Sequence, residues 1–167
     1  IDLGGPINKA AGFVAFSFTT DHVLPVTARS IAIVIPPIGL GLATLLDRRL
    51  TGKRLFNAQL YPQGKTAMFL AFMGISEGAI PFAAKDPLRV IPASVVGGAL
   101  TGALSMYFGC KLMAPHGGLF VLLIPNAINH ALLYLLAIVA GSLVTAVVYA
   151  VIKKSERVEL AVAPVKG

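Results

Sequence analysis

Residues 130–152, HALLYLLAIVAGSLVTAVVYAVI, decide the fold class of this chain. The run holds 23 residues and contains no Asp, Glu, Lys or Arg. A membrane-spanning α-helix needs roughly 20 apolar residues, each adding about 1.5 Å of length. The run therefore predicts a transmembrane helix. Lys153 and Lys154 follow directly, and the positive-inside pattern predicts that the C-terminus lies in the cytoplasm.

The composition of the whole chain agrees with this reading. Of the 167 residues, 56% are hydrophobic and 13% are charged, and the mean hydropathy is +0.82. A soluble domain has about 45–50% apolar and about 25% charged residues. We therefore predict an all-α integral membrane protein with the lipid bilayer as its solvent. The formal net charge is +7, but the basic residues stand at the ends of apolar runs, so we expect no nucleic-acid partner.

The other apolar runs are of two kinds. Residues 30–46 and 90–113 are long enough to span a bilayer, and the basic joint 47–65 between runs is expected on the cytoplasmic side. Residues 66–84 and 117–128 are short or interrupted by Gly, Pro and polar residues. A broken backbone is tolerated in a membrane only against protein or a watery cavity, and transporters use such segments to build substrate sites. We therefore expect these two broken segments, which alternate with full spans, to build a substrate site near the midplane of the membrane.

Two glycines in residues 90–113 predict where helices meet. Gly98 and Gly102 have the small-xxx-small spacing that allows two membrane helices to approach closely.

The stretch GISEGAIPF, residues 74–82, places a carboxylate inside an apolar run. Glu77 is the only charged residue among the 19 from position 66 to position 84. An acid at the membrane centre costs roughly 2.5–3.5 kcal/mol, so it usually faces a polar cavity and has a function. The residues that can open the helix around it are Gly74, Gly78 and Pro81. A carboxylate beside freed amides suits a ligand with many hydroxyls, such as a sugar; pairing with a Lys or Arg of another helix, or protonation, is the alternative.

Three separated blocks carry a family resemblance. They are DLGGPINKAA (2–11), GISEGAIPFAAKDPLRVIP (74–92) and APHGGLFV (114–121). Together they resemble the fructose-type enzyme IIC, the membrane permease of the bacterial phosphoenolpyruvate-dependent sugar phosphotransferase system. The resemblance covers the C-terminal half of a IIC domain and implies the fold of the glucose superfamily, with transmembrane helices and re-entrant hairpins.

The resemblance also implies a function and a set of partners. Residues 1–154 would be part of the sugar transport domain, residues 155–167 a cytoplasmic tail or linker, and the chain a piece of something longer. Such a permease binds fructose or a related hexose and moves it inward while a IIB phosphocysteine phosphorylates it. It forms a homodimer and is a multi-pass protein of the bacterial inner membrane. The phosphoryl carrier would not be on this chain, so we expect no catalytic residue here, and whether the chain itself counts as an enzyme stays open.

Candidate binding residues cluster in these blocks. By position, the resemblance assigns contact with sugar hydroxyls to Glu77, with Ser76 and Gly78 beside it. Asn8 and Lys9 are polar groups among small residues; Lys9 could pair with a carboxylate or donate to hydroxyls, or simply extend to the membrane surface. His116 lies at a break in the chain and could contact the substrate or cap a loop.

The remaining histidines and the cysteine suggest no further chemistry. His22 is expected at a membrane edge, and His130 at the start of the last span, where a substrate contact stays an alternative. The histidines have no i, i+4 spacing, so we expect neither metal nor other cofactor. Cys110 lies in an apolar run and is expected to be structural, because a reactive thiol needs an electropositive, accessible site.

Two other functions compete with a phosphotransferase permease. An ion-coupled secondary sugar transporter would also use broken helices and an intramembrane acid, but it would release unmodified sugar. A purely structural membrane subunit would tolerate the loss of the Glu77 charge. The chain has no GxxxxGK[ST] loop, which argues against an ATP-driven pump.

Overall fold

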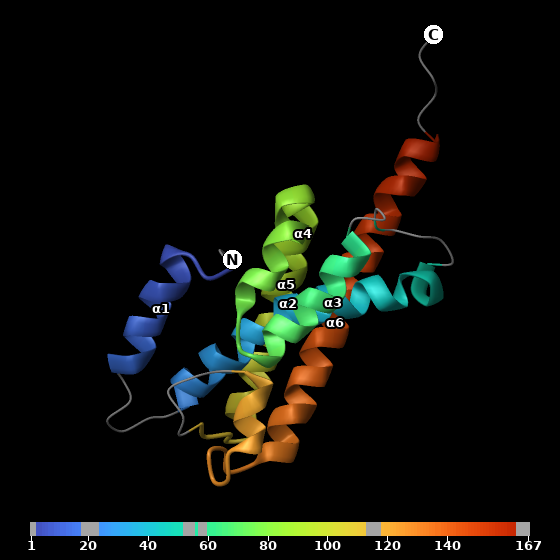
Figure 1. The fold of residues 1–167 in the computed structure, drawn as a ribbon. Coiled ribbons are helices and arrows are strands. Elements are labelled where there is room, and N and C mark those ends of the chain that lie inside the picture. Colours follow the sequence, from blue (N-terminus) through green and yellow to red (C-terminus); the bar gives the residue numbers. More distant parts are fainter. Residues whose placement is uncertain (1–2, 18–23, 52–55, 57–59, 113–117, 163–167) are drawn as a thin grey trace.

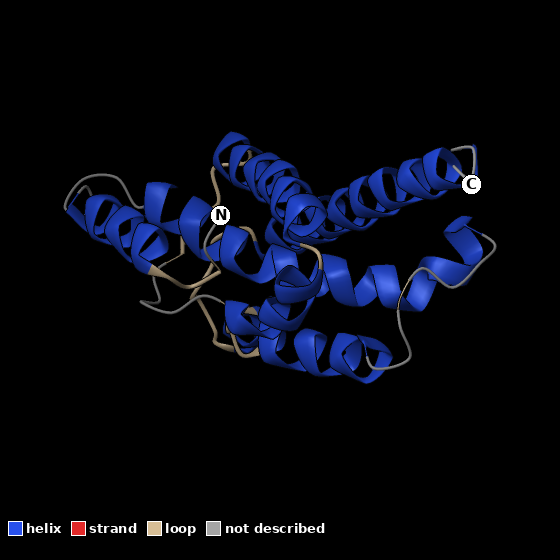
Figure 2. Cartoon of the chain, turned by 90° about the horizontal axis from the view of Figure 1, so that it is seen from above, coloured by secondary structure: helices blue, strands red, loops and turns tan. Residues whose placement is uncertain are grey.

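The computed structural model describes residues 3–17, 24–51, 56, 60–112 and 118–162. In this part of the chain every regular element is a helix, and no strand is present (Figures 1 and 2). The elements are α1 (Pro6–Ser17), α2 (Leu24–Thr51), α3 (Leu60–Phe72), the 3₁₀ helix η1 (Ser76–Ala79), α4 (Ile80–Lys85), α5 (Pro87–Tyr107), the 3₁₀ helix η2 (Leu119–Leu123) and α6 (Ala131–Val162).

Three of the described helices are long and apolar enough to cross a membrane, at Val26–Leu46, Pro87–Tyr107 and Ala131–Lys153. The prediction of an all-α membrane protein is confirmed. The span in α2 is the most buried of the three, because α2 packs against α1, α3, η1, α5 and α6. Helix α1 lies beside the bundle where α2 begins (Figure 1). Helix α6 continues beyond Lys154 to Val162.

The predicted span 90–113 is too long at its C-terminal end. Helix α5 ends at Tyr107, and Gly109 then adopts φ +62°, a left-handed conformation that side chains disfavour and that commonly ends helices. Cys110 therefore lies in the turn after the helix, where its amide donates to the Ser105 carbonyl (2.9 Å). Apolar composition alone does not reveal this end, because residues on both sides of Gly109 are apolar.

Helix α2 runs without a break through Pro36 and Pro37. Prolines have no amide hydrogen, so neither can donate the usual helical bond to the carbonyl of Ala32 or Ile33. Membrane helices tolerate this where neighbouring protein or a cavity meets the freed carbonyls. Ala32, Ile33 and Pro36 all line one cavity.

Glycines set the distances between the three spanning helices. Gly98 and Gly102 face α2 as their spacing predicts, and a Cβ built on either would lie 3.8 Å from the Cβ of Ala32 or Ala28. The closer crossing, which the small-xxx-small spacing did not predict, joins α5 to α6. A Cβ on Gly97 would lie 2.7 Å from the Gly141 carbonyl oxygen, and one on Gly141 would lie 2.9 Å from the Gly97 carbonyl oxygen.

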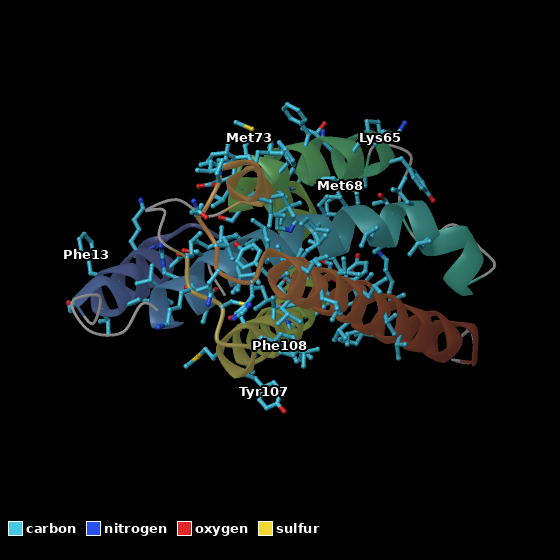
Figure 3. The ribbon with its side chains drawn as sticks, turned by 90° about the horizontal axis from the view of Figure 1, so that it is seen from below. Phe13, Lys65, Met68, Met73, Tyr107 and Phe108 are labelled. Atoms are coloured by element: carbon cyan, nitrogen blue, oxygen red, sulfur yellow. The ribbon has the colours of Figure 1, made fainter. Side chains whose placement is uncertain are left out.

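The outer surface carries large apolar side chains, as a surface that contacts lipid must. Phe13 on α1 and Tyr107 at the end of α5 project away from the bundle (Figure 3), with 77% and 85% of each residue exposed. Leu88 and Leu132 are similarly exposed at the starts of α5 and α6.

Candidate functional site

The segment around Glu77 forms a helix–break–helix hairpin, as the positions of its glycines and proline predict. Helix α3 ends at Phe72, Gly74 takes φ +81°, and η1 and α4 follow. The two arms touch at Gly78, where a built Cβ would lie 2.9 Å from the Ala67 Cα. Because this contact is with backbone, only a residue without a side chain allows the arms to pack this closely.

Glycines from the other two sequence blocks close onto this hairpin. Gly4 lies against its tip, since a Cβ there would be 2.7 Å from Glu77 Oε1 and 3.2 Å from Ser76 Oγ. Gly118 lies against the preceding turn, where a Cβ would be 2.7 Å from the Gly74 amide nitrogen. Both have positive φ, +101° and +123°. The three blocks, far apart in the sequence, thus meet at one place.

The Glu77 side chain is exposed at this meeting point. Ser76 Oγ lies 3.5 Å from Glu77 Oε2, a long hydrogen bond in which the hydroxyl donates. Among the residues that the structure describes, no Lys or Arg forms an ion pair with Glu77. The carboxylate therefore keeps accepting capacity for other donors.

A cavity of about 300 Å³ opens beside the tip, between α1, α2, η1 and α5. Four polar residues line it: Asn8, Arg29, Ser76 and Ser94. Most of the remaining wall is apolar, including Leu3, Ile7, Ala32, Ile33, Pro36 and Val95. An apolar cavity of this size with a few convergent polar groups is the usual form of a small-molecule site.

Two polar atoms at this cavity have no hydrogen-bond partner among the described residues. They are Arg29 Nε and Ser94 Oγ, and both are buried. Arg29 Nη2 donates to Asn8 Oδ1 (3.0 Å), so the guanidinium is held against α1. A buried polar atom without a partner costs about 1–3 kcal/mol, so a site that contains two is suited to a polar ligand.

The structure brings only some of the predicted site residues together. Ser76 and Asn8 line the cavity, and Glu77 adjoins it through Ser76 and Gly4. Gly78 is buried against α3, and Lys9 is exposed and is not part of the cavity wall. The remaining predicted residue, His116, lies outside the described residues, as does His22.

Arg29 and Ser94 were not predicted. Arg29 stands just before the predicted span 30–46, where it looks like a residue of the membrane edge. By length and apolar composition the candidate span runs from Val26 to Leu46, so Arg29 lies within its first turn. Charged residues inside such spans usually have a function. Ser94 carries no local signal, because serine is common where membrane helices pack.

The far ends of the hairpin meet in a charged and aromatic cluster. Asp86, after α4, pairs with Arg89 (2.7 Å) and Lys153 (3.5 Å). The ring of Phe56, from the basic joint 47–65, stacks on Tyr149 with centroids 5.4 Å apart and meets Phe82 edge-on at 5.9 Å. Phe56 also contacts Tyr61 at the start of α3, with centroids 6.4 Å apart. The start of α3, the end of α4 and the part of α6 from Tyr149 to Lys153 therefore lie together.

Cys110 and His130 take no part in this site. Cys110 is fully buried in the core beside Leu112 and Tyr134, and burial raises the pKa of its thiol. His130 is exposed before α6, and its carbonyl accepts from the Tyr134 amide (2.9 Å). Within the described residues no group of three or more His, Cys, Asp or Glu side chains could hold a metal ion.

Comparisons with known proteins identify relatives of most of this chain. It is 65% identical over 146 residues to the "Fructose-like permease IIC component" of Shigella flexneri and to the "Fructose-like permease IIC component 1" of Escherichia coli K12. It is 56% identical over 155 residues to the "PTS system fructose-specific EIIB'BC component" of Vibrio cholerae.

These matches cover 87% of this chain for the first two relatives and 92% for the third. The chain spans only about a third of the length of the first two, 34%, and 26% of the third. No family model matches the chain. No solved structure matches it either. At these identities this chain is homologous to a region of the fructose-type enzyme IIC proteins of the bacterial sugar phosphotransferase system, which confirms the resemblance that the three sequence blocks carry.

Proposed function

We propose that this chain is part of a sugar permease that binds fructose or a related hexose and moves it inward, coupled to its phosphorylation by a IIB phosphocysteine. The observation that carries the proposal is the meeting of Gly4, Ser76 and Glu77 beside a cavity with unpartnered polar atoms. A sugar offers a donor and an acceptor at each hydroxyl, which suits a carboxylate and serine hydroxyls side by side. The names of the relatives add the sugar class and the IIB partner.

In this proposal Glu77 accepts hydrogen bonds from sugar hydroxyls. Ser76 donates a hydrogen bond to one carboxylate oxygen and lines the cavity, and Asn8 lines the same cavity. Gly78 shapes the hairpin so that the tip reaches the sugar. Lys9 lies outside the cavity wall, so its contact with the sugar stays a prediction from the sequence. His116 is proposed as a further contact because it stands two residues before Gly118, which packs on the hairpin turn.

The hairpin α3–η1–α4 is proposed to be re-entrant, entering the membrane and returning on the cytoplasmic side. The support is the ring cluster of Phe56, in which both ends of the hairpin meet Tyr149 of α6, a few residues before Lys153. Residues 47–65 contain many Lys and Arg residues, and Lys153 is itself basic. The positive-inside pattern therefore puts this end in the cytoplasm. The C-terminus is then cytoplasmic in a multi-pass protein of the bacterial inner membrane.

The phosphoryl group would come from a partner. Cys110 is buried and its thiol is less acidic than an exposed one, the opposite of what a phosphoryl-accepting thiolate needs. A IIB domain or subunit would bind at the cytoplasmic end and transfer the group from its cysteine sulfur to a sugar hydroxyl, which loses its proton. The functional unit is proposed to be a homodimer, as in the implied family architecture.

The test is the chemical form in which the sugar arrives. Membrane vesicles that contain the full-length protein, as its gene encodes it, are loaded with phosphorylated IIB and given labelled fructose. We expect labelled sugar phosphate inside, and none when the IIB cysteine is replaced. Accumulation of free sugar driven by a proton or sodium gradient would instead establish the ion-coupled transporter.

A further inference from the structure

We propose that Arg29 and Ser94 contact the sugar directly and determine which monosaccharide fits. This inference rests on the proposed function, since it assigns two more residues to the same site. Neither residue belongs to the three sequence blocks that carry the family resemblance. They stand on different helices, α2 and α5, and both line the cavity beside the Glu77 hairpin.

Arg29 has a donor that the protein leaves unused. Its Nη2 donates to Asn8, but its Nε is buried without a partner in the described structure. The guanidinium lies over Gly12 of α1, where a Cβ would be 2.8 Å from Arg29 Cζ and 2.9 Å from Nε. A guanidinium cannot give up its protons and accepts no hydrogen bond, so Nε needs an acceptor such as a sugar oxygen.

Ser94 differs from the other hydroxyls of its helix. Thr101 and Ser105, on α5, donate to the carbonyls of Gly97 (2.7 Å) and Gly102 (2.8 Å), the usual solution for a hydroxyl in a membrane helix. Ser94 is only 5% exposed, and its Oγ has no partner among the described residues. The Ser94 hydroxyl lines the cavity and makes no hydrogen bond to a carbonyl of its own helix, so it is available to donate to, and accept from, a sugar hydroxyl.

Acceptors lie beside these donors. Pro36 and Pro37 deprive the carbonyls of Ala32 and Ile33 of their helical donors, and both of these residues line the same cavity. Donors, acceptors and apolar wall together match a monosaccharide, whose hydroxyls are polar and whose C–H groups are not. The volume of about 300 Å³ is at the lower end for small-molecule sites, which favours one sugar ring over two.

The experiment measures equilibrium binding of fructose, mannose and glucose to the purified full-length protein and then uses the tightest of the three. Ser94→Ala should weaken binding roughly three- to tenfold, as for one neutral hydrogen bond. Arg29→Lys keeps the charge but removes Nε, and should weaken binding about ten- to a hundredfold. Ser142→Ala is the matched control, because Ser142 Oγ is also buried without a described partner but does not line the cavity. Its affinity should equal that of the wild type.

Gly12→Ala keeps the test valid if Arg29→Lys fails to fold. The three atoms nearest to the new methyl group all belong to the Arg29 guanidinium, the end of a flexible side chain. Alanine also favours a helix, so the protein should fold while the Arg29 guanidinium is displaced. Sugar affinity should fall without loss of thermal stability. Unchanged affinity in folded Ser94→Ala and Gly12→Ala proteins would overturn the inference.

A set of monodeoxy sugars separates contact from indirect structural effects. For the hydroxyl that Ser94 contacts, the deoxy sugar should bind wild type and Ser94→Ala equally. If Ser94→Ala weakens every analogue by the same factor, Ser94 acts through the fold and the inference is wrong. Wild-type protein that binds none of the three sugars would contradict the proposed function itself.

Discussion

The backbone of Gly4 lies directly against the carboxylate of Glu77, and a side chain at position 4 would not fit between them. A Cβ at Gly4 would be 2.7 Å from Glu77 Oε1, closer than such atoms approach in proteins. The chain turns at this point with φ +101°. The two residues are 73 positions apart, so the N-terminal block reaches the hairpin tip here and lies at one side of the proposed sugar site.

Gly4→Ala should weaken sugar binding at least about tenfold, because the methyl group must push the carboxylate or the N-terminal segment away. The left-handed backbone itself would cost roughly 1–2 kcal/mol. Gly109→Ala is the matched control, since Gly109 has φ +62° but a Cβ there would have no atom within 4 Å. It carries similar backbone strain without touching the site. Isothermal titration with fructose compares them; equal affinities in the two variants would contradict the positioning role of Gly4.

Glu77→Gln should weaken sugar binding about ten- to a hundredfold, since a hydrogen bond to a charged group contributes about 1.5–3 kcal/mol. The amide keeps the shape of the side chain but loses the charge and half of its accepting capacity. Equilibrium binding on the purified variant checks this, with assembly verified by size-exclusion chromatography. Wild-type affinity in a well-assembled Glu77→Gln protein would remove this residue from the site.

Gly97→Ala should destabilise the helix bundle by about 1–3 kcal/mol, because a Cβ would press on the Gly141 carbonyl and on Thr145 at the α5–α6 crossing. Gly102→Ala provides the comparison on the same helix. There a Cβ would lie at an ordinary 3.8 Å from Ala28, so the helix propensity of alanine should leave stability equal or higher. Thermal unfolding in detergent measures both. The same melting temperature for the two variants would show that the crossing can relax.

Cys110→Ala should leave phosphorylation-coupled uptake largely intact, because the Cys110 thiol is buried and the proposed phosphoryl carrier is a cysteine of the IIB partner. Burial raises the pKa of Cys110, so less thiolate is present at neutral pH than on an exposed cysteine. Alkylation should therefore be slow in the folded protein and should accelerate as the pH rises or the protein unfolds. Loss of phosphoryl transfer at normal protein levels would place the carrier on this chain.

Residues 47–65 and the tail after Lys153 should both be inaccessible from outside the cell. In a Cys110→Ala background, single cysteines at Thr51 and Ser155 should not react with a membrane-impermeant maleimide in intact cells. A cysteine in place of Lys111, a charged and exposed residue just beyond the end of α5 that lies away from Asp86, should react. Ready labelling of Thr51→Cys or Ser155→Cys from outside would reverse the proposed orientation.

Much of this protein is predictable from local sequence. The span 130–152 follows from an apolar run whose length alone matches a membrane, and the structure places a helix there from Ala131. The break at Glu77 is likewise local, because Gly74 and Pro81 act on the backbone wherever they occur. The carboxylate is conspicuous for the same reason, as the only charge in its run.

The tertiary structure alone decided which distant residues share the site. Arg29 looks like a membrane-edge cation until α1 covers it, places Asn8 at its Nη2 and leaves its Nε without a partner. Ser94 becomes distinctive only because the cavity reaches its side of α5, and Gly97 only because α6 crosses there. Composition and periodicity predict whether each segment contacts lipid, water or the protein interior. Contacts between segments depend on how helices far apart in the sequence cross, and the local pattern does not contain that geometry.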